Sequence, residues 1–163
     1  MKDKKACIFY FLMTIILLDF GNQLRRISFL PYIEKINNSI FSIVHLNNTG
    51  SAFSLLQNQA KILAFFGILV VIFIAIEVFK TISFKDKTEL LALTLFSAGA
   101  LGNIIERLQF GYVVDYIKLN FINFPIFNAF DIMICTGIGL YCFYIFYDFK
   151  NIIKVNNELD KNK

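Results

Sequence analysis

Polar side chains that could perform proton chemistry gather in one otherwise apolar stretch of the chain, residues 97–131. They are Asn103, Glu106, Arg107, Asp115, Asn128 and Asp131. An ionised carboxylate at the margin of a hydrocarbon slab is costly unless it is paired or hydrated, so such a cluster indicates a functional site. Asp115 and Asp131 stand where polar segments meet apolar runs.

These two aspartates are the candidates for catalysis. Carboxylates held close together can share one proton, because like charges about 3 Å apart resist double ionisation. One carboxylate then acts as general base toward a water molecule and the other as general acid, which is the chemistry of an aspartic protease. For either aspartate alone, the alternative is a solvated carboxylate at the membrane interface.

Four short sequence blocks carry a family resemblance. They read NTGSAF at 48–53, GNIIER at 102–107, GYVVDY at 111–116 and FNAFD at 127–131. In order and spacing they resemble the N-x-G-[AS]-A-F, G-N-x-x-D-R, G-x-V-x-D-[FY] and F-N-x-A-D blocks of the signal peptidase II family, which are bacterial intramembrane aspartic proteases. The resemblance covers nearly the whole chain.

The resemblance implies an activity and a set of site residues. It implies an endopeptidase that removes the signal peptide from lipid-modified prolipoproteins by cleaving before the diacylglyceryl-cysteine, with Asp115 and Asp131 as the catalytic pair and with no metal or cofactor. The residues that would bind substrate or support the site are Asp19, Asn48, Gly50, Asn103, Arg107 and Asn128.

Three positions depart from the family pattern. Glu106 stands where the family usually has Asp, and Phe130 replaces a small residue before the second catalytic Asp. Asp19 resembles the acidic residue of a D-Q-x-x-K block in the first helix, but Gln23 occupies the place of the Lys.

Composition places the chain in a bilayer. Of its 163 residues 57% are hydrophobic, mean hydropathy is +0.62, and the apolar residues form four long runs. We predict a single integral-membrane domain, 1–163, with transmembrane helices at about 6–24, 60–79, 90–106 and 131–148. The first run follows three lysines but lacks a small-x-small cleavage site, and its roughly 19 residues give about 28 Å of helix, enough to span.

The connecting segments have their own patterns. Residues 25–58 alternate apolar and polar side chains in places, which favours a small sheet, and the turn signal at 47–50 predicts a hairpin directed toward the site. The polar tail from Asn151 is expected to be frayed. The predicted fold class is therefore an all-α polytopic membrane protein with a small extracytoplasmic β-rich surface element.

The distribution of basic residues predicts the topology. The N-terminus, the loop at 80–87 and the tail together carry ten lysines, whereas the other side of the four runs has six Lys and Arg residues. The positive-inside rule then places both termini in the cytoplasm and the two larger loops, with both aspartates, at the outer face of the bacterial cytoplasmic membrane.

Other classes of function receive less support. The net charge of +4 comes from basic residues at the edges of apolar runs, so we expect membrane lipids rather than nucleic acid as partners. His45 is the single histidine, which argues against a multi-ligand metal centre. The remaining alternative is a small non-enzymatic carrier or assembly protein with an acidic proton or cation path. We assume a monomer, since the sequence does not indicate an oligomeric state.

Overall fold

The computed structural model describes residues 4–30, 36–50, 56–80 and 87–161, with side chains up to residue 154. Its helices and strands, in chain order, are α1 (Lys4–Ser28), β1 (Phe41–Asn48), α2 (Ala60–Lys80), α3 (Lys87–Phe110), β2 (Val113–Leu119) and α4 (Ala129–Lys161). The predicted fold class is confirmed, because four long apolar helices carry one small two-stranded sheet. Residues 51–53 of the first motif and the loop at 81–86 lie outside the described residues.

Each of the four helices is long and apolar enough to cross a membrane. The qualifying segments are Lys4–Ser28, Ala60–Lys80, Lys87–Phe110 and Ala129–Lys154. Large apolar side chains such as Phe11, Phe73 and Phe146 are exposed on the outer surfaces of these helices. In water this exposure would be unfavourable, whereas in a bilayer those faces meet lipid.

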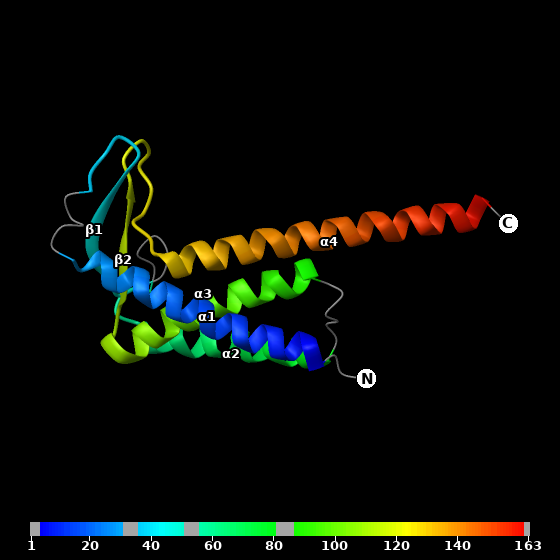
Figure 1. Cartoon of the computed structure of the whole chain (residues 1–163), viewed down its shortest axis with the longest axis horizontal. Coiled ribbons are helices and arrows are strands. Elements are labelled where there is room, and N and C mark those ends of the chain that lie inside the picture. Colours follow the sequence, from blue (N-terminus) through cyan, green and yellow to red (C-terminus); the bar gives the residue numbers. More distant parts are fainter. Residues whose placement is uncertain (1–3, 31–35, 51–55, 81–86, 162–163) are drawn as a thin grey trace.

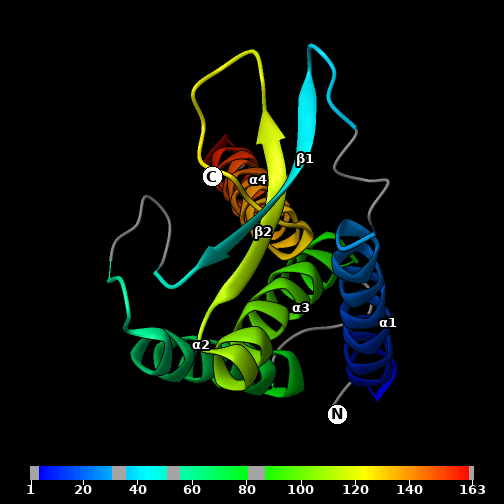
Figure 2. The same ribbon diagram turned by 90° about the vertical axis from the view of Figure 1, so that its left-hand side faces the viewer.

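Helix α3 is the centre of the bundle. It packs against α1, α2 and α4, and Figures 1 and 2 show it running between the others. Ten of its residues are buried, against five each in α1 and α2. Small side chains dominate these ten, which allows neighbouring helices to approach closely. As a result, α3 can carry polar side chains inward without exposing them to lipid.

Phe130 occupies the junction of three helices. Its side chain is 2% exposed, and a Cβ atom added at Gly102 of α3 or at Gly21 of α1 would overlap its ring. A Cβ at Gly99 would likewise meet the backbone oxygen of Phe130. These glycines therefore allow close helix contact, and they make room for the large residue that precedes Asp131.

The sheet corrects one sequence-based prediction. Where a hairpin within residues 25–58 was expected, β1 instead pairs antiparallel with β2, which follows α3, and the described part of 25–58 contains the single bridge Asn37↔Ser42. The pairs run from Phe41↔Leu119 to Asn48↔Val113. The β2 segment VVDYIKL is rich in β-branched residues, which favours a strand, and it lies within the second of the two large loops predicted from the sequence. The sheet therefore joins the two large loops, at the end of the bundle where α1 ends and α4 begins (Figures 1 and 2).

Helix α4 is longer than predicted. Gly137 lies against the backbone of Ala92, so the first residue of α3 is level with about residue 142 of α4. The remaining residues, to Lys161, extend roughly 30 Å past α3, as Figure 1 shows. The expectation of a frayed tail from Asn151 is wrong, because this segment contains no Gly or Pro to end the helix.

Candidate active site

Asp115 is delivered to the site by the turn between α3 and β2. Gly111 ends α3 with a φ of +79° and donates its N–H to the Arg107 carbonyl at 3.0 Å. That left-handed conformation is the one that glycine adopts at helix C-termini without strain. The backbone N–H of Val114 then donates to Glu106 Oε2 at 2.8 Å, which ties the start of β2 to the last turn of α3. Asp115 follows directly and is 2% exposed.

Asp131 is fixed in the first turn of α4 by a reciprocal cap. Asn128 Oδ1 accepts the Asp131 N–H at 3.1 Å, and Asp131 Oδ2 accepts the Asn128 N–H at 3.0 Å. This arrangement resembles a capping box, in which two otherwise unsatisfied N–H groups at a helix N-terminus are paired. A carboxylate at this position also interacts favourably with the positive end of the helix dipole.

Three asparagine side chains connect the two carboxylates. Asn128 Nδ2 donates to Asp115 Oδ1 at 2.8 Å and lies 3.2 Å from Asn103 Oδ1. Asn103 Nδ2 donates to Asp131 Oδ1 at 2.8 Å. Asn48, from β1, donates to Asp115 Oδ2 at 2.9 Å. Asn128 thus contacts both aspartates, and four separate elements meet at one polar network within an apolar bundle.

Two arginines surround the network. Arg107 Nη2 donates to the Gly50 carbonyl at 2.8 Å, so this side chain connects α3 to the segment after β1. Arg25, from α1, lies with Nε 3.3 Å from Glu106 Oε1, an ion pair without an aligned hydrogen bond. Glu106 is 3% exposed, so Arg25 supplies the cation that a buried carboxylate requires.

The electrostatics of the site favour a shared proton. Burial raises the pKa of Asp115 to about 6, and the negative charge of Asp131 contributes to the increase. Hydrogen bonds from Asn48 and Asn128 and the charge of Arg107 oppose it. Burial also raises the pKa of Tyr116, whose hydroxyl accepts the Ala129 N–H at 3.1 Å and therefore stays neutral at the start of α4.

The structure places most of the predicted site residues together. The network contains Asn48, Asn103, Asp115, Asn128 and Asp131, with Gly50 and Arg107 beside it. Asp19 lies apart from it: this side chain is exposed on α1, and its hydrogen bond, at 2.6 Å, comes from Gln23 one turn later.

Sequence reasoning missed Arg25, which we had counted only toward topology. The signal was present, since a glutamate among small apolar residues near the end of a membrane helix needs a cationic partner. Among the described residues, no group of three or more His, Cys, Asp or Glu side chains is placed to hold a metal ion. The chemistry that this arrangement can perform is therefore that of two carboxyl groups, hydrogen-bonded by amides and close to a guanidinium.

Comparisons with known proteins agree with this chemistry. A profile of the family described as Signal peptidase (SPase) II matches residues 11–147. The chain is similar to the lipoprotein signal peptidase of Streptococcus agalactiae serotype Ia, with 39% identity over 78% of this chain and 84% of that protein. It is also similar to the lipoprotein signal peptidase of Pseudoalteromonas translucida, with 32% identity over 80% of this chain and 82% of the relative.

A solved structure shares the fold. A bacterial membrane enzyme determined by the in meso method at 2.3 Å resolution superposes with a TM-score of 0.78 and 26% identity, over 87% of this chain and 90% of the other. Together with the four apolar helices, this similarity shows that the chain is a multi-pass membrane protein.

Proposed function

The chain belongs to the signal peptidase II family, and on that premise we propose that its Asp115 and Asp131 cleave lipid-modified prolipoproteins before the diacylglyceryl-cysteine. The observation that carries this proposal is the contact of Asn128 with both carboxylates, through its side-chain amide to Asp115 and its backbone N–H to Asp131. The named relatives are peptidases, so the alternative of a non-enzymatic carrier has no support from them.

The reaction needs one proton held between the two carboxyl groups. Burial raises the pKa of Asp115 to about 6, which supports Asp115 as the holder of that proton and Asp131 as the base. Asp131 takes a proton from water while the water oxygen attacks the scissile carbonyl carbon, and Asp115 donates its proton to the carbonyl oxygen. The tetrahedral intermediate collapses when protonated Asp131 gives its proton to the amide nitrogen and the carbon–nitrogen bond breaks. Asp115 takes back a proton from one hydroxyl of the intermediate as the new carboxyl forms, so both side chains return to their starting states. The products are a signal peptide with a free carboxylate and a lipidated cysteine with a free amine.

The remaining polar residues position the substrate and the pair. Asn48, Asn103 and Asn128 hold the carboxylates by N–H donation, which leaves the opposite oxygen lone pairs for water and proton transfer. Arg107 lies near both carboxylates and offers guanidinium N–H groups to a substrate carbonyl or an anionic headgroup. Asp19 lies apart from the network, and its proposed role is limited to lipid or substrate contact on the exposed face of α1.

We also propose an orientation. The helices alternate in direction, so the described ends at Lys4 and Lys161 lie opposite the sheet (Figure 1). The excess of lysines at that end supports cytoplasmic termini, with the sheet and the aspartates at the outer face of the bacterial cytoplasmic membrane. A monomer in contact with membrane lipids is sufficient for this reaction, because the described chain supplies both carboxylates.

The test is cleavage by the purified protein in detergent. The substrate is a synthetic precursor peptide whose cysteine carries a diacylglyceryl group, and the same peptide without lipid is the control. We expect a single cut before the lipidated cysteine, identified by mass spectrometry, and little cleavage of the control. Cleavage at other positions, or none by folded protein, would contradict the proposed function.

A further inference from the structure

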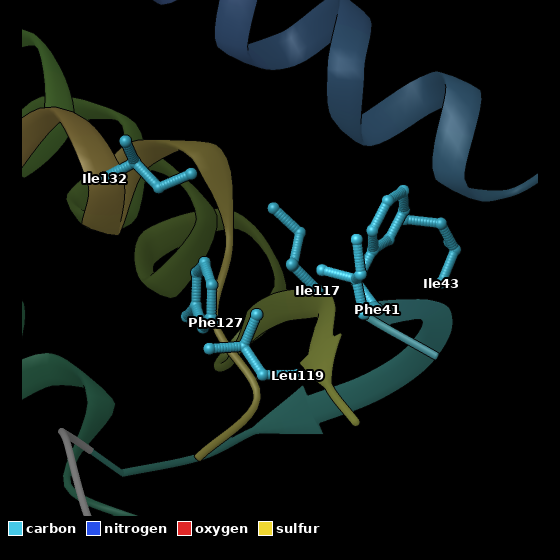
Figure 3. Close-up of a pocket in the computed structure, with 7 residues that line it drawn as sticks. Phe41, Ile43, Ile117, Leu119, Phe127 and Ile132 are labelled. Carbon is cyan, nitrogen blue, oxygen red and sulfur yellow. The ribbon is translucent and has the colours of Figure 1, made fainter. Parts of the chain in front are cut away.

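An apolar pocket of about 320 Å³ lies between the sheet and the first turn of α4. Figure 3 shows the side chains gathered around it. They are Ile40, Phe41, Ile43, Ile117, Leu119, Phe127 and Ile132. All are aliphatic or aromatic, and no described polar side chain lines the space. The mechanism above does not use this pocket.

The pocket opens on the same face of the sheet as the catalytic aspartate. Side chains alternate along a strand, so Asp115, Ile117 and Leu119 of β2 share one face. Between Ile43 and Leu46 the register shifts, because two residues of β1 lie opposite one residue of β2. Such a bulge bends the strand and changes the direction of the side chains that follow it. Because of this bulge, Ile43 pairs with Ile117 while Asn48 reaches Asp115.

The lining residues also adjoin the site along the chain. Phe127 precedes Asn128, and its backbone pairs with Ile117 through hydrogen bonds of 2.8 and 3.1 Å. Ile132 follows Asp131 in the first turn of α4. A substrate whose scissile bond lies at the two carboxylates therefore places its neighbouring atoms at the mouth of the pocket.

The lining and the volume of the pocket indicate which atoms of the substrate it binds. A pocket without a hydrogen-bond partner disfavours a peptide backbone, because buried amide groups left unpaired are costly. A buried water needs only about 10–15 Å³ of such space, so the pocket holds a run of methylene groups rather than one small side chain. Two of the lining side chains, Ile40 and Ile132, are 61% and 47% exposed, so the pocket is open to the surroundings on their side.

We propose that this pocket binds one acyl chain of the lipid-modified substrate. The proposal rests on the proposed function, since it assigns a subsite to the same active site. The chain attached to the cysteine would enter between the sheet and Ile132 and lie against Ile43 and Ile117. An unbound acyl chain in detergent already lies in hydrocarbon, so the gain per bound methylene comes from van der Waals packing against the lining, and kcat/KM should rise with acyl length for that reason.

The experiment combines substrates of two acyl lengths with variants that fill the pocket. Ile43→Trp and Leu119→Trp fill it from different strands. Ile122→Trp makes the same kind of change at an exposed residue outside the lining and is the matched control. The probes are one precursor peptide carrying either two palmitoyl or two octanoyl chains, in one detergent, and the readout is the ratio of their kcat/KM values.

We expect wild type and Ile122→Trp to share one palmitoyl-to-octanoyl ratio, and both filled variants to lower that ratio about threefold or more, because the longer chain loses its packing against the lining. Residual cleavage of the octanoyl peptide shows that each variant is folded. An equal loss on both peptides, or an unchanged palmitoyl-to-octanoyl ratio in both filled variants, would overturn the acyl assignment. Neither result affects the proposed function, which fails only if wild type cleaves no lipidated precursor.

Discussion

The ion pair between Arg25 and Glu106 should control where Asp115 sits. Glu106 accepts the Val114 N–H with one oxygen and faces Arg25 with the other, so one side chain joins α1, α3 and the start of β2. We therefore choose Arg25→Gln, Glu106→Gln and the double variant as the perturbation. Glutamine keeps the length of Glu106 and one acceptor oxygen, so that the Val114 contact can persist.

The expected magnitudes follow from burial. Glu106 is 3% exposed, so Arg25→Gln leaves a buried carboxylate without its cation, which costs about 3 kcal/mol or more. The Arg25 side chain is 18% exposed and partly hydrated, so Glu106→Gln should cost less, about 1–2 kcal/mol. The double variant removes both charges and should be less destabilised than the sum, by a coupling energy of about 1–3 kcal/mol.

Two assays separate stability from positioning. Thermal unfolding in detergent, followed by circular dichroism because the chain has no tryptophan, gives the double-mutant cycle. Cleavage of a lipidated peptide gives kcat and KM. A shift of about 1 Å in a catalytic group can cost about 100-fold in rate, so Glu106→Ala, which also frees Val114, should lower kcat more than tenfold with a smaller change in KM. The matched control is Arg26→Gln, an exposed neighbour on α1.

Additive stability changes, within about 0.5 kcal/mol, would refute the coupling between the two side chains. An unchanged kcat in Glu106→Ala, in protein that is folded at the assay temperature, would refute the positioning role. A higher kcat in Glu106→Gln than in Glu106→Ala would show that the hydrogen bond to Val114, and not the negative charge of Glu106, positions Asp115.

Three further predictions concern other parts of the molecule. Burial raises the pKa of Asp115 from 3.8 to about 6, so this carboxyl stabilises the fold fully below about pH 4 and loses that contribution as the pH rises through 6. The loss is about 3 kcal/mol, and it should be absent in Asp115→Asn. Wild-type hydrolysis should follow a bell-shaped pH profile. Gly102→Ala should overpack against Phe130 and cost about 1–3 kcal/mol, less in a Phe130→Ala background. In a cysteine-free background, Ile122→Cys should be labelled from outside intact cells and Asn151→Cys should not.

Each of these has a result that contradicts it. A stability difference between wild type and Asp115→Asn that does not change from pH 4 to pH 7 would show that the carboxyl is not desolvated. Equal costs of Gly102→Ala with and without the Phe130 ring would show that the two residues do not touch. Labelling of Asn151→Cys in unpermeabilised cells would reverse the orientation and move the sheet to the cytoplasmic side.

Much of the fold could be predicted because long apolar runs have a direct physical meaning. A run of about 20 apolar residues must be a spanning helix, since no other single segment satisfies its backbone in lipid. Strand pairing is different, because the partner of β1 lies beyond two helices and local alternation in Phe41–Asn48 carries no information about it. The pairing of β1 with β2 could not be predicted for that reason.

Part of the candidate site could be predicted from the sequence for a similar reason. Asp115, Asp131 and the asparagines could be singled out because polar groups at membrane depth require a function or a partner. Arg25 could not be paired from the chain alone, because α1 and the end of α3 meet only in three dimensions. The exposed position of Asp19 likewise depends on how α1 packs against its neighbours, which the chain alone does not give.

The central claim is that Asp115 and Asp131 act as one catalytic pair, and the most direct measurement is turnover of a diacylglyceryl-cysteine peptide by wild type, Asp115→Asn and Asp131→Asn. Asparagine keeps the shape of each side chain but cannot exchange the proton, and loss of a general acid or base costs about 10²–10⁴-fold. We predict that each variant is folded, as judged by circular dichroism, and has a kcat at least about 100-fold below that of wild type. Retention of more than a few per cent of activity by either variant would remove that residue from the catalytic pair.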